Sequence, residues 1–155
     1  MTETMTFTAV ARGRPRGGIA IPLPFDPASV WGDRDRYYLA GWIEQYPMRA
    51  VVSGGAAEPV MELGPAWCRD PRMAAGATLS VRLHPEGPQL ETLASDLAEA
   101  IGAYPSARRF FESLATHYRK GFVSWVESAK RPETRSRRVT EVVAALAAGR
   151  RERGG

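Results

Sequence analysis

The stretch ATLSVRLHPEGPQLETLASDLAEAI, residues 77–101, changes its hydrophobic period partway along. Over residues 77–84 apolar and polar side chains alternate one by one, which is the pattern of a half-buried strand. Farther on, apolar residues recur at helical spacing: Leu90, Leu93, Ala94, Leu97 and Ile101. This change from a period of 2 to a period of 3.6 predicts an α+β protein, with a β-rich first half and a helical second half.

The first half repeats the alternating pattern in short runs. Gly- and Pro-rich joints separate these runs and limit each strand to a few residues. Runs with strand character cover residues 5–11, 18–24, 37–44, 48–53, 58–63 and 77–84, and a single helical turn is expected at residues 25–32. Six or seven short strands with this spacing predict a small β-barrel domain over residues 1–87.

The second half predicts a helical segment over residues 88–150. Proline suits the first turn of a helix, because its missing N–H would have no intrahelical partner there. Pro105 and Pro132 therefore open two helices, Thr116 is expected to cap the helix between them, and Gly149 ends the last one. Each apolar stripe is narrow, so we expect these three or four helices to pack on the barrel.

Composition limits the class of protein. Of 155 residues, 44% are hydrophobic and 25% charged, which suits a globular fold with a substantial core. The longest apolar run, residues 142–148, is far shorter than the roughly 20 residues that span a bilayer, so we expect no membrane insertion. A single cysteine excludes an intrachain disulfide and predicts a cytoplasmic protein. The last residues, 151–155, are expected to form a frayed tail.

Charge is distributed unevenly along the chain. Residues 1–104 hold nine Lys and Arg against twelve Asp and Glu, whereas residues 105–155 hold twelve against five. The densest cationic group surrounds the expected helix start at Pro132, where the helix dipole disfavours positive charge. The residues of this group that we expect to bind an anion are Lys130, Thr134, Arg135 and Arg138.

Three explanations of this cationic group stay open. Acids elsewhere in the fold neutralise it, and the first half offers Asp33, Asp35, Glu44, Glu58 and Glu62. Alternatively, the cations and the free N–H groups of the helix start hold a phosphate or carboxylate. In the third explanation the group is simply a solvated face. Internal pairing ranks first and anion binding second.

A tract within the second half is similar to a known family. Residues 125–138, with the pattern W-V-x-x-A-K-x-x-E-T-R-x-R-R, resemble the YdeI/OmpD-associated family, also called bacteriocin-protection proteins. Residues 31–32 and 41–43 resemble the barrel domain of unknown function that often precedes this helical segment. The resemblance implies a double-split-barrel-like fold followed by a helical appendage, and it implies no established enzyme activity.

Residues with catalytic potential are few and scattered. His84 and His117 have no His, Cys or carboxylate nearby at the spacing of metal ligands. Cys68 stands beside Arg69, which would favour a thiolate, but a lone cysteine in a loop is more often inert. We therefore predict no catalytic residue, no metal site and no cofactor.

The aromatic residues of the first half allow two interpretations. Trp31, Tyr38 and Trp42 would line a ligand pocket inside the barrel, since such pockets are apolar with a few polar anchors. They would equally fill the interior of a small barrel, which has room for little more than side chains. Core filling ranks above a pocket.

Together these observations predict a non-enzymatic, cytoplasmic binding or stress-protection protein of the YdeI/OmpD-associated type. Its partner would be a small anionic ligand or an acidic protein. The alternative is non-specific nucleic-acid binding by the basic residues 105–155. That alternative ranks lower, because acids alternate with the bases there and no recognition helix or stacking platform stands out. An enzyme acting on a small molecule inside the barrel ranks third.

Overall fold

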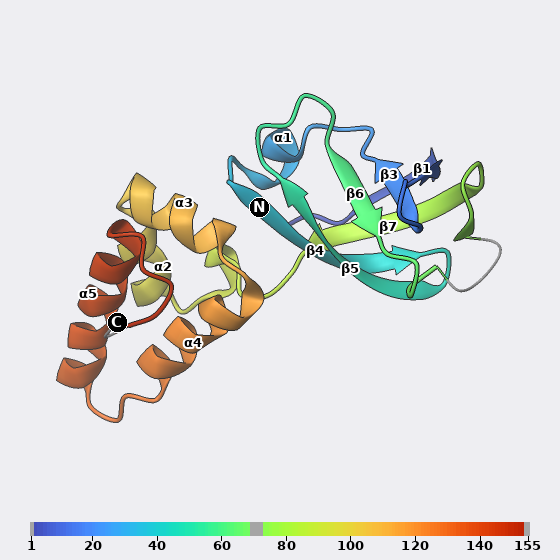
Figure 1. Cartoon of the computed structure of the whole chain (residues 1–155). Coiled ribbons are helices and arrows are strands. Elements are labelled where there is room, and N and C mark those ends of the chain that lie inside the picture. Colours follow the sequence, from blue (N-terminus) through green and yellow to red (C-terminus); the bar gives the residue numbers. More distant parts are fainter. Residues whose placement is uncertain (1, 69–72, 154–155) are drawn as a thin grey trace. The chain divides into compact units, whose positions relative to one another are not determined.

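A computed structural model describes residues 2–68 and 73–153 of the chain. It divides into two compact units, Met1–Pro85 and Glu86–Gly155, and each unit has its own buried hydrophobic cluster. Strands make up most of the regular structure of the first unit, and helices make up that of the second (Figure 1). The predicted α+β class is confirmed.

The first unit contains two antiparallel sheets. The four-stranded sheet has the order β1 (Met5–Val10), β7 (Thr78–Pro85), β4 (Arg36–Ile43) and β5 (Tyr46–Ser53). The three-stranded sheet has the order β2 (Arg12–Gly13), β3 (Ile19–Pro22) and β6 (Val60–Leu63). The short helix α1 (Pro27–Trp31) joins β3 to β4, within the helical turn predicted at residues 25–32. Its N-cap is Asp26, whose carboxylate accepts the N–H of Ala28 at 3.1 Å.

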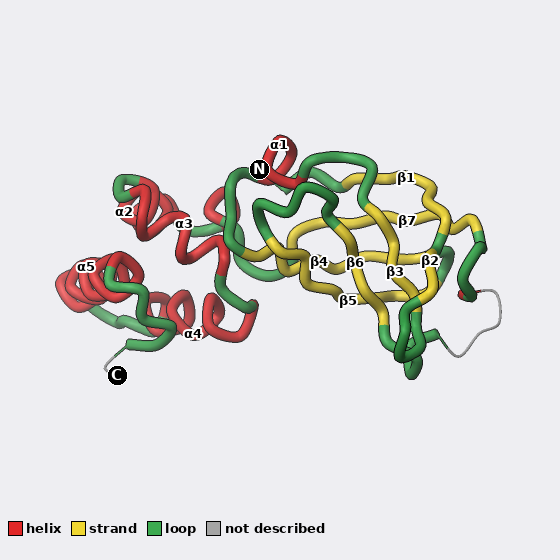
Figure 2. The backbone as a smooth tube through the Cα atoms, turned by 45° about the horizontal axis from the view of Figure 1, so that its top comes forward, coloured by secondary structure: helices red, strands yellow, loops and turns green. Residues whose placement is uncertain are grey.

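The two sheets do not close into one barrel, so this part of the prediction is wrong. The described ladders end at β1 and β5 in one sheet and at β2 and β6 in the other. In Figure 2 the strands of the smaller sheet cross those of the larger sheet steeply. Strand β2 pairs over two residues only, and Pro22 on β3 has no N–H to donate. Such short strands extend the ladder too little to complete a barrel.

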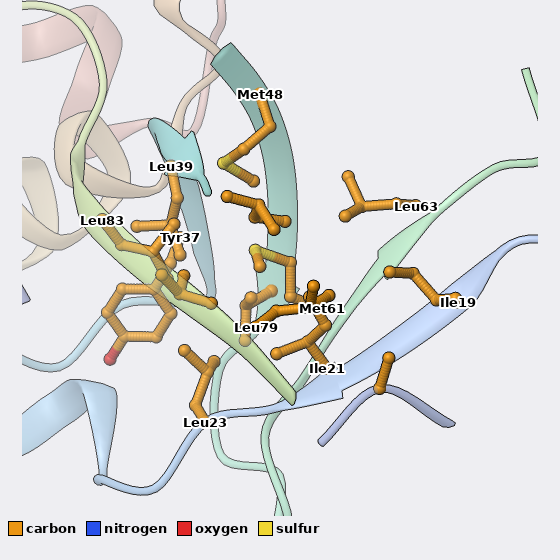
Figure 3. Close-up of a cluster of buried hydrophobic side chains, with 14 of the residues drawn as sticks. Ile19, Ile21, Leu23, Tyr37, Leu39, Met48, Met61, Leu63, Leu79 and Leu83 are labelled. Atoms are coloured by element: carbon orange, nitrogen blue, oxygen red, sulfur yellow. The ribbon is translucent and has the colours of Figure 1, made fainter. Parts of the chain in front are cut away.

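Strict alternation on the long strands places the core of this unit between the sheets. On β4 and β7 every second side chain is buried, as the pattern of single-residue alternation predicts. The aliphatic side chains from both sheets meet there (Figure 3). The residues labelled in that cluster are Ile19, Ile21, Leu23, Tyr37, Leu39, Met48, Met61, Leu63, Leu79 and Leu83.

Gly41 allows β4 and β7 to approach closely in the middle of the larger sheet. A Cβ atom at this position would lie 1.8 Å from the carbonyl oxygen of Arg82, which is backbone and cannot move aside easily. Only glycine therefore fits between Ala40, which pairs with His84, and Trp42, which pairs with Arg82.

The second unit contains four helices and one 3-10 turn. Their bounds are η2 (Leu90–Thr92), α2 (Ser95–Gly102), α3 (Pro105–Ser113), α4 (Thr116–Glu127) and α5 (Pro132–Ala147). The prolines open α3 and α5 as predicted. The apolar stripe that begins at Leu90 does not form one helix, because Gln89 and Thr92 close a capping box around η2 and the chain is extended at Leu93. No helix among the described residues combines the length and apolarity needed to span a bilayer.

The helices bury their apolar stripes against one another. Phe111, Val126 and Val142, from three different helices, are fully buried in one cluster. We had expected these stripes to need the barrel for burial, but large side chains such as Phe122, at 2% exposure, find their contacts within the helical unit. The unit therefore has a core of its own.

A buried guanidinium holds the start of this unit. Arg119 on α4 is 1% exposed and donates to three carbonyl oxygens: Leu114 at 3.0 Å, Pro88 at 2.7 Å and Glu86 at 2.5 Å. Thr116, which we had expected to be an N-cap, is the first residue of α4, and its hydroxyl donates to the Glu86 carboxylate instead. Charge-assisted bonds to backbone carbonyls thus pin residues 86–88 to α4.

We expect the fragment Glu86–Gly155 to unfold cooperatively on its own, because its core is internal. A shorter fragment, residues 89–155, removes the carbonyls of Pro88 and Glu86, which accept hydrogen bonds from Nη1 and Nη2 of Arg119. The free energy of unfolding should then fall by about 2–3 kcal/mol. Urea denaturation of both fragments, followed by circular dichroism, measures the difference.

The control for this comparison is Glu86→Ala in the longer fragment, which keeps the backbone carbonyl while removing the carboxylate that Thr116 contacts. Its loss should be the smaller of the two. A longer fragment without a cooperative transition would show that the helices depend on the first unit for folding.

Candidate functional site

Arg135, in the second turn of α5, is held by two carboxylates from two other helices. Its Nε and Nη2 donate to Asp96 on α2 at 2.7 and 2.9 Å. Its Nη2 and Nη1 donate to Glu127, the last residue of α4, at 3.0 and 3.2 Å. This double fork matches the planar guanidinium geometry and ties α2, α4 and α5 together at one point.

The ion pairing changes the protonation equilibria of both partners. Hydrogen bonds from Arg135 lower the pKa of Asp96 from 3.8 to about 2. The carboxylates of Asp96 and Glu127 raise the pKa of Arg135 further above its usual value. Asp96 and Arg135 therefore remain charged at neutral pH, and Arg135 has little donor capacity left for a ligand.

Arg138, one turn later, is bound to the end of α4. Its Nη1 donates to the carbonyl of Trp125 at 2.8 Å and to the hydroxyl of Ser128 at 3.0 Å. Its guanidinium carbon lies 5.0 Å from the centre of the Trp125 ring, and that of Arg153 lies 4.7 Å from the same ring. The Nε atom of Arg138 is buried without a hydrogen-bond partner among the described residues.

The acids that neutralise the cationic group come from the helical unit itself. Sequence reasoning looked to the acidic first half, but Glu58 and Glu62 pair there with Arg12 and Arg14. It missed Asp96 and Glu127, although Glu127 stands within the same tract, eight residues before Arg135.

Lys130 and Thr134 are left on the outer side of this network. Lys130 and its neighbour Arg131 are exposed, and Thr134 is half-buried. Arg131 occupies the N-cap position of α5 without a side-chain cap hydrogen bond. The N–H groups of the first helical turn have no intrahelical acceptor, so those of Glu133 and Thr134 point away from the helix beside two cations.

The structure does not bring Trp31, Tyr38 and Trp42 into one pocket. Trp31 is fully buried at the end of α1, where its indole N–H donates to the carbonyl of Glu3 at 2.7 Å. Successive side chains of a strand point to opposite faces, and Tyr37 and Leu39 are buried. Tyr38 and Trp42 therefore lie on the outward side of β4. Trp31 thus belongs to the core, and the other two belong to the surface of the sheet.

The remaining reactive side chains are isolated. Burial is the main reason that the pKa of the Cys68 thiol is raised, which disfavours the reactive thiolate, and Arg69 lies outside the described residues. The Nδ1 atom of His84 lies 3.2 Å from the carbonyl oxygen of Pro85. Within residues 2–68 and 73–153, no three His, Cys, Asp or Glu side chains are grouped as metal ligands would be.

The basic tail contacts α4. The guanidinium of Arg151 lies 5.1 Å from the ring centre of Tyr118, as that of Arg153 lies over Trp125. A cavity of about 320 Å³ opens between these tail residues and the helix, lined by His117, Tyr118, Gly121, Phe122, Arg151, Glu152 and Arg153. The cavity offers both cations and aromatic rings to a ligand.

The Arg135 network should make stability depend on acid pH. The folded pKa of Asp96 lies below its unfolded value, so its carboxylate stabilises the fold above about pH 4, and this contribution is lost as the pH falls towards 2. Asp96 is half exposed, so we expect only about 1 kcal/mol. Urea unfolding of wild type and Asp96→Asn between neutral and acid pH should show curves that converge as the pH falls.

Glu99→Gln is the matched control, because it removes an exposed acid from the same helix. Its unfolding free energy should run parallel to that of the wild type. Equal pH dependence of wild type and Asp96→Asn would contradict the proposed role of the ion pair.

Comparison with known proteins agrees with the tract seen in the sequence. The family described as Bacteriocin-protection, YdeI or OmpD-Associated matches residues 92–149, which include α2, α3, α4, α5 and the whole Arg135 network. No curated protein matches the chain. Residues 92–149 are therefore similar to the bacteriocin-protection, YdeI or OmpD-associated family, in agreement with the resemblance of residues 125–138.

Proposed function

We propose that this chain is a non-enzymatic binding protein with a protective role of the kind that the family description names. Its anionic ligand, or an acidic group of a partner protein, binds at the connection between α4 and α5. We name this site the α4–α5 loop site and define it by Lys130, Arg131 and Thr134. A cytoplasmic location fits the single, unpaired Cys68.

One observation carries this proposal: the fold separates the cations of the tract into two layers. Arg135 and Arg138 form the inner layer, because acids, a carbonyl and an indole ring bind them. Lys130 and Arg131 form the outer layer, and both are exposed. The contacts of Arg135 and Arg138 fix the backbone of the loop. The backbone that carries Lys130 and Arg131 therefore does not have to be ordered when a ligand binds.

Backbone groups add to the attraction for an anion. The first-turn N–H groups of α5 carry the positive end of the helix dipole, and an anion at this position is stabilised by both the dipole and direct hydrogen bonds. Glu133 in the same turn weakens the attraction, since its carboxylate competes for the same N–H groups. We therefore expect modest affinity for a simple anion such as phosphate.

An enzymatic role receives less support from the geometry. Of the three aromatic residues expected to line a barrel pocket, Trp31 is buried in the core, whereas Tyr38 and Trp42 lie on the outward side of β4. The pKa of the Cys68 thiol is raised, chiefly by burial, which disfavours the thiolate. Nucleic-acid binding by the basic second half is also weakened, because Arg135 and Arg138 are engaged within the unit.

Phosphate should raise the melting temperature of the protein at constant ionic strength. A ligand that binds only the folded state stabilises it by mass action, by about 1.8 kcal/mol at twenty times the dissociation constant. The double variant Lys130→Ala/Arg131→Ala should abolish this gain while keeping the melting temperature of the unliganded protein, since both side chains are exposed. A thermal-shift series with sodium phosphate, with sodium chloride as the reference salt, measures both effects.

Lys120→Ala provides the charge control, because Lys120 is exposed on α4 outside the loop site. It should respond to phosphate as the wild type does. An equal loss of response in this control would mean that phosphate acts through net charge, and an undiminished response in the double variant would refute the loop site.

A further inference from the structure

The four strands of the larger sheet contain no acidic residue. The sequences of β1, β4, β5 and β7 are MTFTAV, RYYLAGWI, YPMRAVVS and TLSVRLHP, and their only charged residues are Arg36, Arg49 and Arg82. All three are exposed and occupy the phase of the strand that faces away from the core. On the side that faces away from the core, the four strands therefore contribute arginines and no acidic residue.

Trp42 lies on this outward surface, near the end of β4. It pairs with Arg82 on β7 and with Pro47 on β5, and it is 39% exposed, which is unusual for a large aromatic side chain. The Arg82 guanidinium lies 4.7 Å from its ring centre, and the His84 ring is centred 6.4 Å away. The indole is thus presented beside a cation that can stack or form ion pairs.

The same surface continues along β4 and β5. Tyr38 is four residues from Trp42 on the same face, about 13 Å along the strand. Its partner across the ladder, Val51, is 51% exposed. Arg36 lies at the far end, and Arg49 lies opposite Ala40, between the two aromatic positions.

Acids flank β4 at both ends, because Asp35 precedes Arg36 and Glu44 lies in the turn after Ile43. The carboxylate of Glu44 accepts the backbone N–H of Ser80 at 2.8 Å, at the end of the sheet. Among described residues, Arg36 and Arg82 form no ion pair, so their charges are available to a partner. The surface thus combines flat aromatic groups with uncompensated guanidiniums.

We propose that this outward face binds single-stranded nucleic acid, with a base stacked on Trp42 and Arg82 and phosphates held by Arg36 and Arg82. Stacking on exposed aromatic and guanidinium groups of a sheet suits unpaired bases, whose faces are accessible, and not the bases of a duplex. An acidic protein would use the arginines but would gain little from the indole. This site lies in the first unit and is independent of the α4–α5 loop site.

This proposal differs from the nucleic-acid hypothesis that the sequence suggested. The sequence hypothesis relied on the basic residues 105–155, whereas the structure assigns the contact to strands from the first 85 residues. The stacking platform was hidden in the sequence because Trp42 and Arg82 are forty residues apart and become neighbours only through the β4–β7 ladder.

Fluorescence anisotropy with a labelled deoxythymidine oligonucleotide of about 12 nucleotides tests the proposal on the full chain. Binding should be detectable at about 50 mM salt and should weaken steeply as salt rises. Trp42→Leu removes the ring but keeps an apolar side chain, and it should weaken binding about tenfold, whereas Trp42→Phe should retain most of the affinity. Arg82→Ala should weaken binding and reduce the slope of log affinity against log salt by about 0.7.

Two exposed residues of the helical unit serve as matched controls. Tyr104→Ala removes an aromatic side chain that is 57% exposed, and Arg137→Ala removes an exposed guanidinium. Both should bind the oligonucleotide as the wild type does. Melting temperatures close to that of the wild type would confirm that Trp42→Leu and Arg82→Ala are folded.

Several results would overturn the proposal. These are no binding by the wild type at low salt, equal affinity for a duplex of the same length, or unchanged binding by Trp42→Leu. Loss of binding in Lys130→Ala/Arg131→Ala but not in Arg82→Ala would place the nucleic acid on the loop site instead. Displacement by polyglutamate or by anionic vesicles as effective as that by unlabelled oligonucleotide would show a general anion surface.

Discussion

The buried guanidinium of Arg119 is the interaction on which the helical unit depends. It satisfies carbonyl groups from the segment that follows β7 and from Leu114 at the end of α3, so one side chain sets where α4 begins relative to both. Gly87 makes the contact possible, because a Cβ atom there would lie 2.8 Å from the methyl group of Thr116. The position of α4 then determines where Trp125 and Glu127 meet the side chains of α5. A charge that is costly to bury is thus compensated by fixed carbonyl dipoles.

Local sequence patterns predicted most helices and strands. Sheet closure depends on contacts between distant residues, which these patterns do not report. The predicted strand 37–44 is observed at Arg36–Ile43, because alternation reports burial directly. The helix starts at Pro105 and Pro132 could also be predicted from local sequence, because proline fixes its own φ angle at a value that suits the first turn of a helix. The break at Leu93 was missed because the capping box of Gln89 and Thr92 outweighed a continuous apolar stripe. Closure of the barrel depended on pairing between distant strands, about which periodicity carries no information.

The candidate sites show the same limit. The tract around Pro132 predicted a cationic group. Which of its cations stay exposed depends on Asp96, which pairs with Arg135 from 39 residues earlier in the chain. Only the folded unit shows that Arg135 and Arg138 support the loop while Lys130 remains outside. Likewise, Tyr38 and Trp42 were recognised as notable aromatics, but their side of the sheet follows from the phase of β4 relative to the core. The sequence shows the type of each candidate site residue, but only the structure shows whether its side chain faces the core or the surface.

Because the larger sheet stays open, strand β5 leaves an edge where another chain could add a strand and begin aggregation. Pro47 blocks this at its position. The indole N–H of Trp67 donates to the Pro47 carbonyl at 3.1 Å, so that carbonyl is already occupied, and proline has no N–H to offer an incoming strand. Arg49, two residues on, adds a charge that repels a second copy of the same edge. Pro47, Trp67 and Arg49 therefore protect this open edge of the sheet from growing into a larger assembly.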